Sequence, residues 1–210
     1  SMGELIALNR QTPAIHYLTQ KDSRLCRLID LIGEIKYQPY EDGYSFLVST
    51  IIGQMLSNKV ADVLFQRIID MCGGVSPEIM CNIDAEQLRK IGISYRKSNT
   101  ISELTQAVIS RDLDLYKLYS LTDEAVIRTL TSIKGIGMWT AKMYLIFVLD
   151  RPDILPFEDG AFLQSYCWLY HTQECSPKDV KERCRIWSPY SSYAARFLYK
   201  ALDSGLTKKS

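Results

Sequence analysis

Two glycines that flank a single apolar residue, Gly135 and Gly137, constrain the fold of this chain more than any other feature. Glycine reaches positive φ angles and allows close approach of the backbone, because it has no Cβ atom. Before the glycines, Thr122 is typical of a helix N-cap and is followed by two acidic residues. After them, residues 139–149 are almost entirely apolar, which favours a buried helix. The pattern predicts two helices joined by a tight turn within residues 122–149.

The predicted turn is suited to bind an anion. The first amides of a helix have no partner within the helix, and the amides of a glycine turn point outward in the same way. Together they can hold a phosphate, which would position a nucleic acid without reading its sequence. An ordinary helix–helix turn has the same Gly-x-Gly spacing, so for this motif taken alone a turn without a ligand is the alternative.

The remainder of the sequence predicts further helices. No alternation of apolar and polar residues persists long enough for a sheet. The apolar segment 46–55 is expected to form a buried helix. Further helices are predicted to start where a capping residue precedes a periodic segment, at Ser57 and Asp84. Two more are predicted at Ser76-Pro77 and Ser176-Pro177, where proline follows the cap in the first turn. We therefore expect an all-α protein.

Length and composition set bounds on the class of protein. The 210 residues, 47% of them hydrophobic, suffice for one large domain or two small lobes, and no Pro/Gly/Ser-rich linker divides them. We expect a single domain over residues 1–210. The chain has no apolar run of transmembrane length and no signal-peptide pattern. We therefore expect an intracellular protein, in the cytoplasm, the nucleoid or the nucleus, that does not contact a membrane.

Charge and cysteine content give weaker constraints. The formal net charge is +1, so basic residues that bind a nucleic acid would have to be concentrated on one surface. The six cysteines include no C-x-x-C pair, which argues against a zinc site, and we expect them to be reduced. With only two histidines, a histidine-based metal site or a Ser-His-Asp triad is poorly supported.

Four motifs occur along the chain in a recognisable order. The first motif is Tyr44-Ser45-Phe46-Leu47-Val48 with Ile52-Gly53-Gln54-Met55-Leu56-Ser57, and the second is Leu88-Arg89 with Ile91-Gly92-Ile93-Ser94. The third is Lys134-Gly135-Ile136-Gly137 with Trp139-Thr140-Ala141, followed by Arg151-Pro152-Asp153, Pro156 and Asp159. The fourth is Trp187 with Pro189-Tyr190 and Ser192-Tyr193-Ala194-Ala195. Over roughly residues 37–202, this order resembles the helix-hairpin-helix DNA glycosylases of the 3-methyladenine (alkylbase) branch.

The resemblance implies a fold and a function. The fold would be two helical lobes with a helix-hairpin-helix motif and a DNA-binding cleft between them. The protein would act as a monomer in base excision repair, on double-stranded DNA that contains damaged bases. It would flip an alkylated purine of the 3-methyladenine type out of the duplex and hydrolyse its N-glycosidic bond, which leaves an abasic site.

The same resemblance assigns the catalytic role to Asp159, in a catalytic loop over residues 150–160. Cleavage of an N-glycosidic bond develops positive charge on the sugar, so a fixed carboxylate stabilises the transition state and can orient the attacking water. Glu158 and Asp153 are the second choices. An aspartate just before Gly160 could also be a helix N-cap, which is the structural alternative.

Three aromatic residues are expected to form the substrate pocket. Relatives that also cut the DNA backbone carry a nucleophilic lysine two residues after the second hairpin glycine. Trp139 stands at that position here, so we expect a monofunctional enzyme, and its indole would attract a cationic alkylated base. Tyr44 and Tyr199 match pocket positions more loosely. Core packing is the alternative for all three.

The resemblance also implies the contacts to DNA. A wedge that fills the space left by the flipped base would lie in the turn that contains Gln54, Met55 and Ser57. Met55 stands where many relatives have a second glutamine, and it could instead be a core residue. In the hairpin, the residues expected to hold the DNA backbone are Lys134, Gly135, Gly137 and Thr140.

The resemblance implies no organic cofactor. The main-chain carbonyls of Ile133 and Ile136 are expected to hold a monovalent cation. Some relatives carry an iron–sulfur cluster on four closely spaced cysteines, but Cys167, Cys175 and Cys184 are too far apart and lack a fourth, so no cluster is expected. Two other functions stay open: a noncatalytic protein that binds DNA lesions, and a glycosylase for uracil or mismatched bases.

Overall fold

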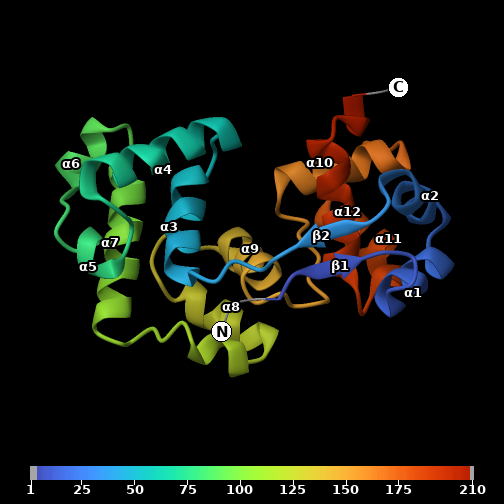
Figure 1. The fold of residues 1–210 in the computed structure, drawn as a ribbon, viewed down its shortest axis with the longest axis horizontal. Coiled ribbons are helices and arrows are strands. Elements are labelled where there is room, and N and C mark those ends of the chain that lie inside the picture. Colours follow the sequence, from blue (N-terminus) through green and yellow to red (C-terminus); the bar gives the residue numbers. More distant parts are fainter. Residues whose placement is uncertain (1–3, 209–210) are drawn as a thin grey trace. The chain divides into compact units, whose positions relative to one another are not determined.

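The computed structural model describes residues 4–208, and the chain forms two compact units. Unit 1 comprises Ser1–Pro39 and Asp150–Ser210, and unit 2 comprises Tyr40–Leu149. The chain thus begins in unit 1, passes through unit 2 and returns. In Figure 1 the blue N-terminal elements and the orange and red C-terminal elements belong to unit 1.

Unit 2 is helical and is built around one apolar helix. Its elements are α3 (Gly43–Gly53), α4 (Asn58–Cys72), α5 (Pro77–Met80), α6 (Ala85–Lys90), α7 (Tyr95–Ile109), the 3-10 helix η1 (Lys117–Ser120), α8 (Asp123–Thr131) and α9 (Met138–Phe147). Helix α3 packs against α4, α7 and α9, and it buries Leu47, Val48, Ile51 and Ile52. The predicted buried helix over residues 46–55 is confirmed, with its bounds shifted toward the N-terminus.

The predicted helix starts are confirmed by the capping hydrogen bonds. In each case the side chain before the helix accepts a backbone amide of the first turn. These capping residues are Ser57, Ser76, Asp84, Thr122 and Ser176. At the other end of α4, Gly73 adopts the left-handed conformation with φ 83°, as glycine does where a helix stops.

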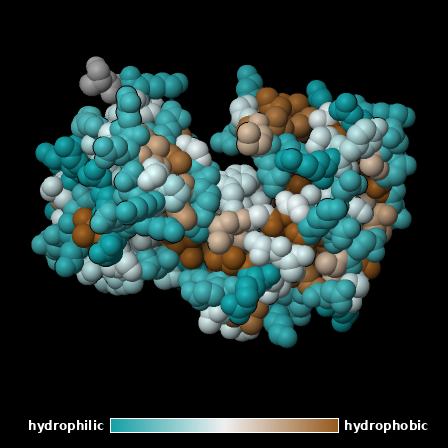
Figure 2. Space-filling model, turned by 180° about the vertical axis from the view of Figure 1, so that it is seen from behind, coloured by the Kyte–Doolittle hydropathy of each residue, from teal (hydrophilic) through white to brown (hydrophobic). Residues whose placement is uncertain are grey.

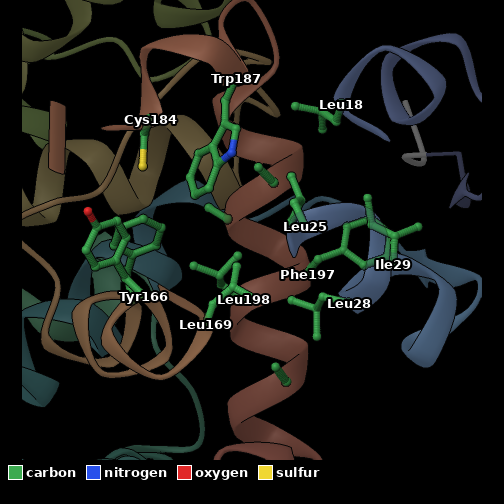
Figure 3. Packing of buried hydrophobic residues seen from close by; sticks show 14 of the residues in the cluster. Leu18, Leu25, Leu28, Ile29, Tyr166, Leu169, Cys184, Trp187, Phe197 and Leu198 are labelled. Atoms are coloured by element: carbon green, nitrogen blue, oxygen red, sulfur yellow. The ribbon is translucent and has the colours of Figure 1, made fainter. Parts of the chain in front are cut away.

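Unit 1 combines both ends of the chain around α12. Its elements are β1 (Ile6–Leu8), α1 (Pro13–Lys21), α2 (Ser23–Ile32), β2 (Ile35–Tyr37), α10 (Gly160–Tyr170), α11 (Pro177–Arg183), the 3-10 helix η2 (Cys184–Trp187), α12 (Ser191–Asp203) and the 3-10 helix η3 (Leu206–Lys208). Helices α1, α2 and α10 pack against α12. Figure 3 shows side chains of α2, α10 and η2 gathered around Phe197 and Leu198 of α12.

The short sheet was not predicted. Strands β1 and β2 form an antiparallel sheet in which Ile6 pairs with Tyr37 and Leu8 pairs with Ile35. The expectation of no sheet was therefore wrong in this detail, although the protein is otherwise helical. Each strand has three residues, which is too short for an alternating pattern to be recognised in the sequence.

The longest described helices, α4 and α7, have 15 residues each. In the part of the chain that the structure describes, no helix has the length and apolar character needed to cross a membrane. On the face drawn in Figure 2 the surface is mostly hydrophilic, and the hydrophobic colour is confined to separate patches.

A buried carboxylate joins three elements of unit 1. Asp22 is 6% exposed and caps α2, where its Oδ1 accepts the amides of Arg24 and Leu25, each at 3.1 Å. Its Oδ2 accepts the indole N–H of Trp187 at 2.9 Å and the hydroxyl of Tyr170. Burial and the nearby Asp22 raise the pKa of Tyr170, so the phenol stays protonated and remains a donor.

We predict that Asp22→Ala lowers the free energy of unfolding by about 2–4 kcal/mol, because it removes a helix cap and leaves the buried donors of Trp187 and Tyr170 without their acceptor. The matched control is Asp84→Ala, which removes an exposed N-cap and is expected to cost about 1 kcal/mol. Urea unfolding measures both. Equal losses for the two variants would show that the buried bonds of Asp22 add nothing to its cap.

Candidate functional site

The loop of residues 150–160 is hydrogen-bonded to the start of α12. The amide of Ser192 donates to the carbonyl of Pro152 at 3.0 Å, and the hydroxyl of Ser192 accepts the amide of Ile154 at 2.8 Å. Both groups of the loop are backbone groups, so these bonds fix its path whatever its side chains are. Ser192 belongs to the fourth sequence motif, and its structural role is to hold the backbone of this loop.

An ion pair and a stacked cation hold the beginning of the same loop. Tyr37 of β2 donates its hydroxyl to Oδ1 of Asp150 at 2.8 Å. Arg196 of α12 lies 3.6 Å from the same oxygen, and its guanidinium carbon lies 3.5 Å from the centroid of the Tyr37 ring. Burial raises the pKa of Asp150, and the Tyr37 hydroxyl and Arg196 oppose that effect.

Asp153, a second choice for catalysis, is engaged in local bonds. Its Oδ2 accepts the hydroxyl of Ser188 at 2.6 Å, and its Oδ1 accepts the amide of Ser191 at 3.1 Å. Both carboxylate oxygens therefore stabilise the start of α12. Glu158, the other second choice, is half-buried and contributes negative charge near Tyr199.

Asp159 lies at the end of the loop, where it caps α10. It is 8% exposed, and its Oδ2 accepts the amide of Phe162 at 3.0 Å and the hydroxyl of Tyr199 at 2.8 Å. The helix N-terminus favours negative charge at this position. Asp159, the predicted catalytic residue, is therefore also the N-cap of α10, which was the structural alternative to a catalytic role. The two roles are compatible because a capping carboxylate stays in place.

The hairpin of unit 2 depends on its two glycines in different ways. Gly135 has φ +95°, and a Cβ atom there would lie 1.9 Å from Oγ1 of Thr100 on α7. A side chain at this position would therefore collide with α7. A Cβ atom on Gly137 would meet no atom within 4 Å. The fold therefore requires glycine at position 135 but not at position 137.

The predicted phosphate site is built mainly from backbone amides. Gly137 is the N-cap of α9 and provides no side-chain cap for the first-turn amides. Lys134, Gly135 and Gly137 are exposed. Thr140 is 1% exposed, and its hydroxyl accepts the side-chain amide of Gln54 at 3.3 Å. The Thr140 side chain is therefore packed inside unit 2, and its contact with DNA stays a prediction.

The turn after α3 holds a methionine in an unusual conformation. Met55 has φ 63°, a region that residues other than glycine seldom adopt, and it is 95% exposed. Met55 is therefore not a core residue. Ser57 is exposed and caps α4, and Gln54 is bonded to the hairpin helix as described above.

Lys97 holds this turn in place. Its Nζ donates to the carbonyls of Ile52 and Gln54 at 2.7 and 2.6 Å. Burial, and to a lesser extent the neighbouring Arg96, lower the pKa of Lys97. Nothing in the sequence pattern indicates its real partners, because they are carbonyls more than 40 positions away.

The three predicted pocket aromatics differ in their surroundings. Tyr44 is 4% exposed, and its hydroxyl shares a 2.7 Å hydrogen bond with Thr105, while burial raises its pKa to about 12. This packing favours the alternative that Tyr44 is a core residue of unit 2. Trp139 is half-buried in the first turn of α9. Tyr199 belongs to unit 1 and bonds to Asp159.

Side-chain groups that could hold a metal ion are missing from residues 4–208: no three His, Cys, Asp or Glu side chains lie together there. All six cysteines are free thiols. In the hairpin, the carbonyl of Ile133 accepts the amide of Ile136 at 3.0 Å. A carbonyl oxygen has a second lone pair, so this bond leaves the Ile133 carbonyl able to bind a cation.

Comparison with known proteins gives consistent matches. Residues 48–189 match the HhH-GPD superfamily of base excision DNA repair proteins. A DNA-3-methyladenine glycosylase of Schizosaccharomyces pombe is 31% identical over 90% of this chain and 86% of its own length. A crystal structure of a DNA-3-methyladenine glycosidase from Bacillus halodurans has a TM-score of 0.82 at 32% identity, over 97% of this chain and 95% of that one.

A further match includes DNA. The structure of a 3-methyladenine DNA glycosylase of Schizosaccharomyces pombe in complex with abasic DNA has a TM-score of 0.81 at 29% identity. The match covers 91% of this chain and 97% of that one. Relatives that match over nearly their whole length thus share both the sequence pattern and the fold.

The two hairpin glycines allow a paired test. Gly135→Ala is expected to lower the free energy of unfolding by about 2 kcal/mol or more, because the new methyl group would overlap Thr100 and the residue would keep a positive φ. Gly137→Ala is expected to cost about 1 kcal/mol at most, as at other N-caps. Its effect should fall instead on the affinity for duplex DNA, which we expect to drop roughly 10-fold because the methyl group separates phosphate from the amides.

Urea unfolding and fluorescence anisotropy with a labelled duplex measure the two effects. If Gly137→Ala bound DNA as tightly as the wild type, the hairpin amides would not be a phosphate site.

Proposed function

The chain belongs to the HhH-GPD superfamily of base excision DNA repair proteins, and from this premise we propose that it is a glycosylase that removes alkylated purines of the 3-methyladenine type from double-stranded DNA. The observation that carries the proposal is the carboxylate of Asp159, which is 8% exposed and held by two donors at the start of α10. A carboxylate fixed in this way is what a reaction with positive charge on the sugar requires.

The proposed reaction needs only water and the residues of the site. The bond between C1′ of the deoxyribose and the purine nitrogen breaks, and its electron pair leaves with the base, which is neutralised if it carried an alkyl-induced positive charge. Asp159 stabilises the cationic sugar. A water oxygen then bonds to C1′, and the water proton passes to the carboxylate or to solvent. The products are a free base and an abasic site.

Trp139 supports a monofunctional enzyme. An enzyme that cuts the backbone needs an amine nucleophile to form a Schiff base with the sugar. The first turn of α9 offers an indole at this position, and an indole cannot attack the sugar. We assign Trp139 to the substrate pocket, where its electron-rich face would attract a cationic base.

The exposed and strained conformation of Met55 supports a role for this residue in base flipping. A non-glycine residue with positive φ costs about 1–2 kcal/mol, and such strain is found where function requires it. Here the strained residue exposes 95% of its surface at the tip of a turn that Lys97 holds from behind. We propose that Met55 enters the base stack and occupies the space of the flipped nucleotide.

The hairpin would hold the DNA backbone. Phosphate would lie against the exposed amides around Gly135 and Gly137, with Lys134 nearby. We extend the proposal to a monovalent cation on the carbonyls of Ile133 and Ile136, which would add positive charge beside the phosphate. We propose that the protein works as a monomer and acts wherever the cell keeps its DNA, in the nucleoid or the nucleus.

Release of free base tests the function. We expect the wild type to release methylated purine from alkylated duplex DNA, and Asp159→Asn to do so at least about 100-fold more slowly. Asparagine also caps helices and accepts hydrogen bonds, so this variant should fold normally. The control is Asp84→Asn, the same change at an exposed cap of α6, which should leave the rate unchanged.

The form of the DNA product distinguishes the alternatives. Strand breaks should appear only after alkaline treatment. Binding of damaged DNA without any base release would instead indicate a noncatalytic lesion-binding protein. Release of uracil or mismatched thymine, but not of methylated purine, would replace the proposed substrate.

We predict opposite effects of Met55→Gly on stability and on activity. Glycine accepts the positive φ without strain, so the free energy of unfolding should not fall. Release of methylated purine from duplex DNA should slow roughly 10-fold, because no side chain then fills the gap in the stack. The control is Met71→Gly at another exposed methionine, in α4, which should lose about 1 kcal/mol of stability and keep its rate. An unchanged rate for Met55→Gly would contradict the wedge.

A further inference from the structure

We propose that Tyr199 is a positioning residue for the carboxylate of Asp159, and that its hydroxyl group, rather than stacking of its ring on a flipped base, is its main contribution to the reaction. The inference rests on the proposed function, because it assumes that Asp159 is the catalytic carboxylate. It differs from the role that the family resemblance suggests for Tyr199, which is a wall of the substrate pocket.

The carboxylate oxygen Oδ2 of Asp159 accepts hydrogen bonds from two helices. Two donors meet at this single oxygen, the amide of Phe162 at 3.0 Å and the hydroxyl of Tyr199 at 2.8 Å. The amide comes from the first turn of α10 and the hydroxyl comes from α12, so the carboxylate is bonded to two helices. The amide alone would hold the oxygen as in any N-cap, whereas a second donor from another helix also restricts rotation of the carboxylate plane.

The hydroxyl of Tyr199 is a permanent hydrogen-bond donor. The pKa of Tyr199 is raised well above its ordinary value, first by burial and then by the negative charge and hydrogen bond of Asp159. Glu158 adds to this increase, and the positive charge of Arg196 opposes it. The phenol therefore keeps its proton at any pH at which the protein works, and the carboxylate always finds a donor there.

The packing of α12 keeps the Tyr199 hydroxyl beside Asp159. Its neighbours on α12, Phe197 and Leu198, are fully buried in the core of unit 1. The Tyr199 ring packs edge-on against Phe162, with centroids 6.4 Å apart. One turn before it, Arg196 is fixed by its stacking on Tyr37. Both donors to Oδ2 thus belong to residues that pack on each other.

A hydroxyl with these constraints keeps the carboxylate oriented. Orientation matters because a charge stabilises the transition state only when it is already directed at the developing positive charge. Loss of the hydroxyl should therefore slow the chemical step and leave the binding of DNA intact.

Tyr199→Phe tests this directly, since it removes the hydroxyl and retains the ring. We expect the single-turnover rate of methylated purine release to fall roughly 10- to 100-fold, the effect of losing a hydrogen bond to a charged group. Affinity for a duplex that contains an abasic-site analogue should stay within about 2-fold, because no group that contacts DNA has changed.

The matched control is Tyr166→Phe. Tyr166 is a buried tyrosine of α10, and its hydroxyl accepts a hydrogen bond from Nε of Arg183 at 2.9 Å and makes no bond to Asp159. Removal of the Tyr166 hydroxyl should leave the rate of base release unchanged. It therefore shows what the loss of a buried hydroxyl does to unit 1 in general.

The outcomes separate this inference from the proposed function. If the wild type releases no methylated or other base, the proposed function fails. If the wild type is active and Tyr199→Phe matches it in rate, the positioning role is wrong and the ring alone matters. Weaker DNA affinity with an unchanged rate would likewise overturn the inference in favour of a pocket wall.

Discussion

The hydrogen bonds and the ion pair between α12 and the loop of residues 150–160 are the constraint on which the candidate active site depends. They occur at intervals along the helix: Ser192 holds the backbone of the loop, Arg196 holds Asp150, and Tyr199 holds Asp159. A loop without secondary structure would ordinarily sample many conformations, and each ordered residue costs about 1–2 kcal/mol of conformational entropy. Here a buried helix fixes the loop, so the carboxylate is positioned before any DNA is bound.

The helix itself is fixed by the core of unit 1. Phe197 and Leu198 are surrounded by side chains of α2 and α10, and the buried Asp22 links α2 to Tyr170 and Trp187. Residues from both ends of the chain therefore contribute to the position of Asp159, although none of the N-terminal ones carries chemistry. This explains how the proposed catalytic aspartate can depend on segments that precede it by more than 100 positions.

Local sequence signals predicted local structure well. Helix caps, the glycine turn and the apolar segments all rest on interactions between residues a few positions apart, such as Asp159 with Phe162 or Ser57 with Val60. The short sheet was missed because three-residue strands carry no pattern, and its two strands meet only in the folded chain. The assignment of Asp159 came from a family motif and stays a prediction until it is tested.

What the sequence could not predict was the set of side chains that hold the site. Tyr199 is 40 positions from Asp159, Lys97 is 43 positions from Gln54, and Gln54 is 86 positions from Thr140. Such pairs depend on how helices pack, and no spacing rule identifies them. The same is true of the difference between Gly135 and Gly137, which look alike in the sequence but face a helix in one case and open space in the other.

The most direct test of this account is a double-mutant cycle between Asp159→Asn and Tyr199→Phe, read out as the single-turnover rate of methylated purine release. If the hydroxyl of Tyr199 acts through the carboxylate, its removal should slow the enzyme when Asp159 is present and have almost no further effect in the Asp159→Asn background, because residues that act as a unit are strongly non-additive. An equal loss of rate in both backgrounds would contradict the account, since it would mean that Tyr199 acts independently of Asp159.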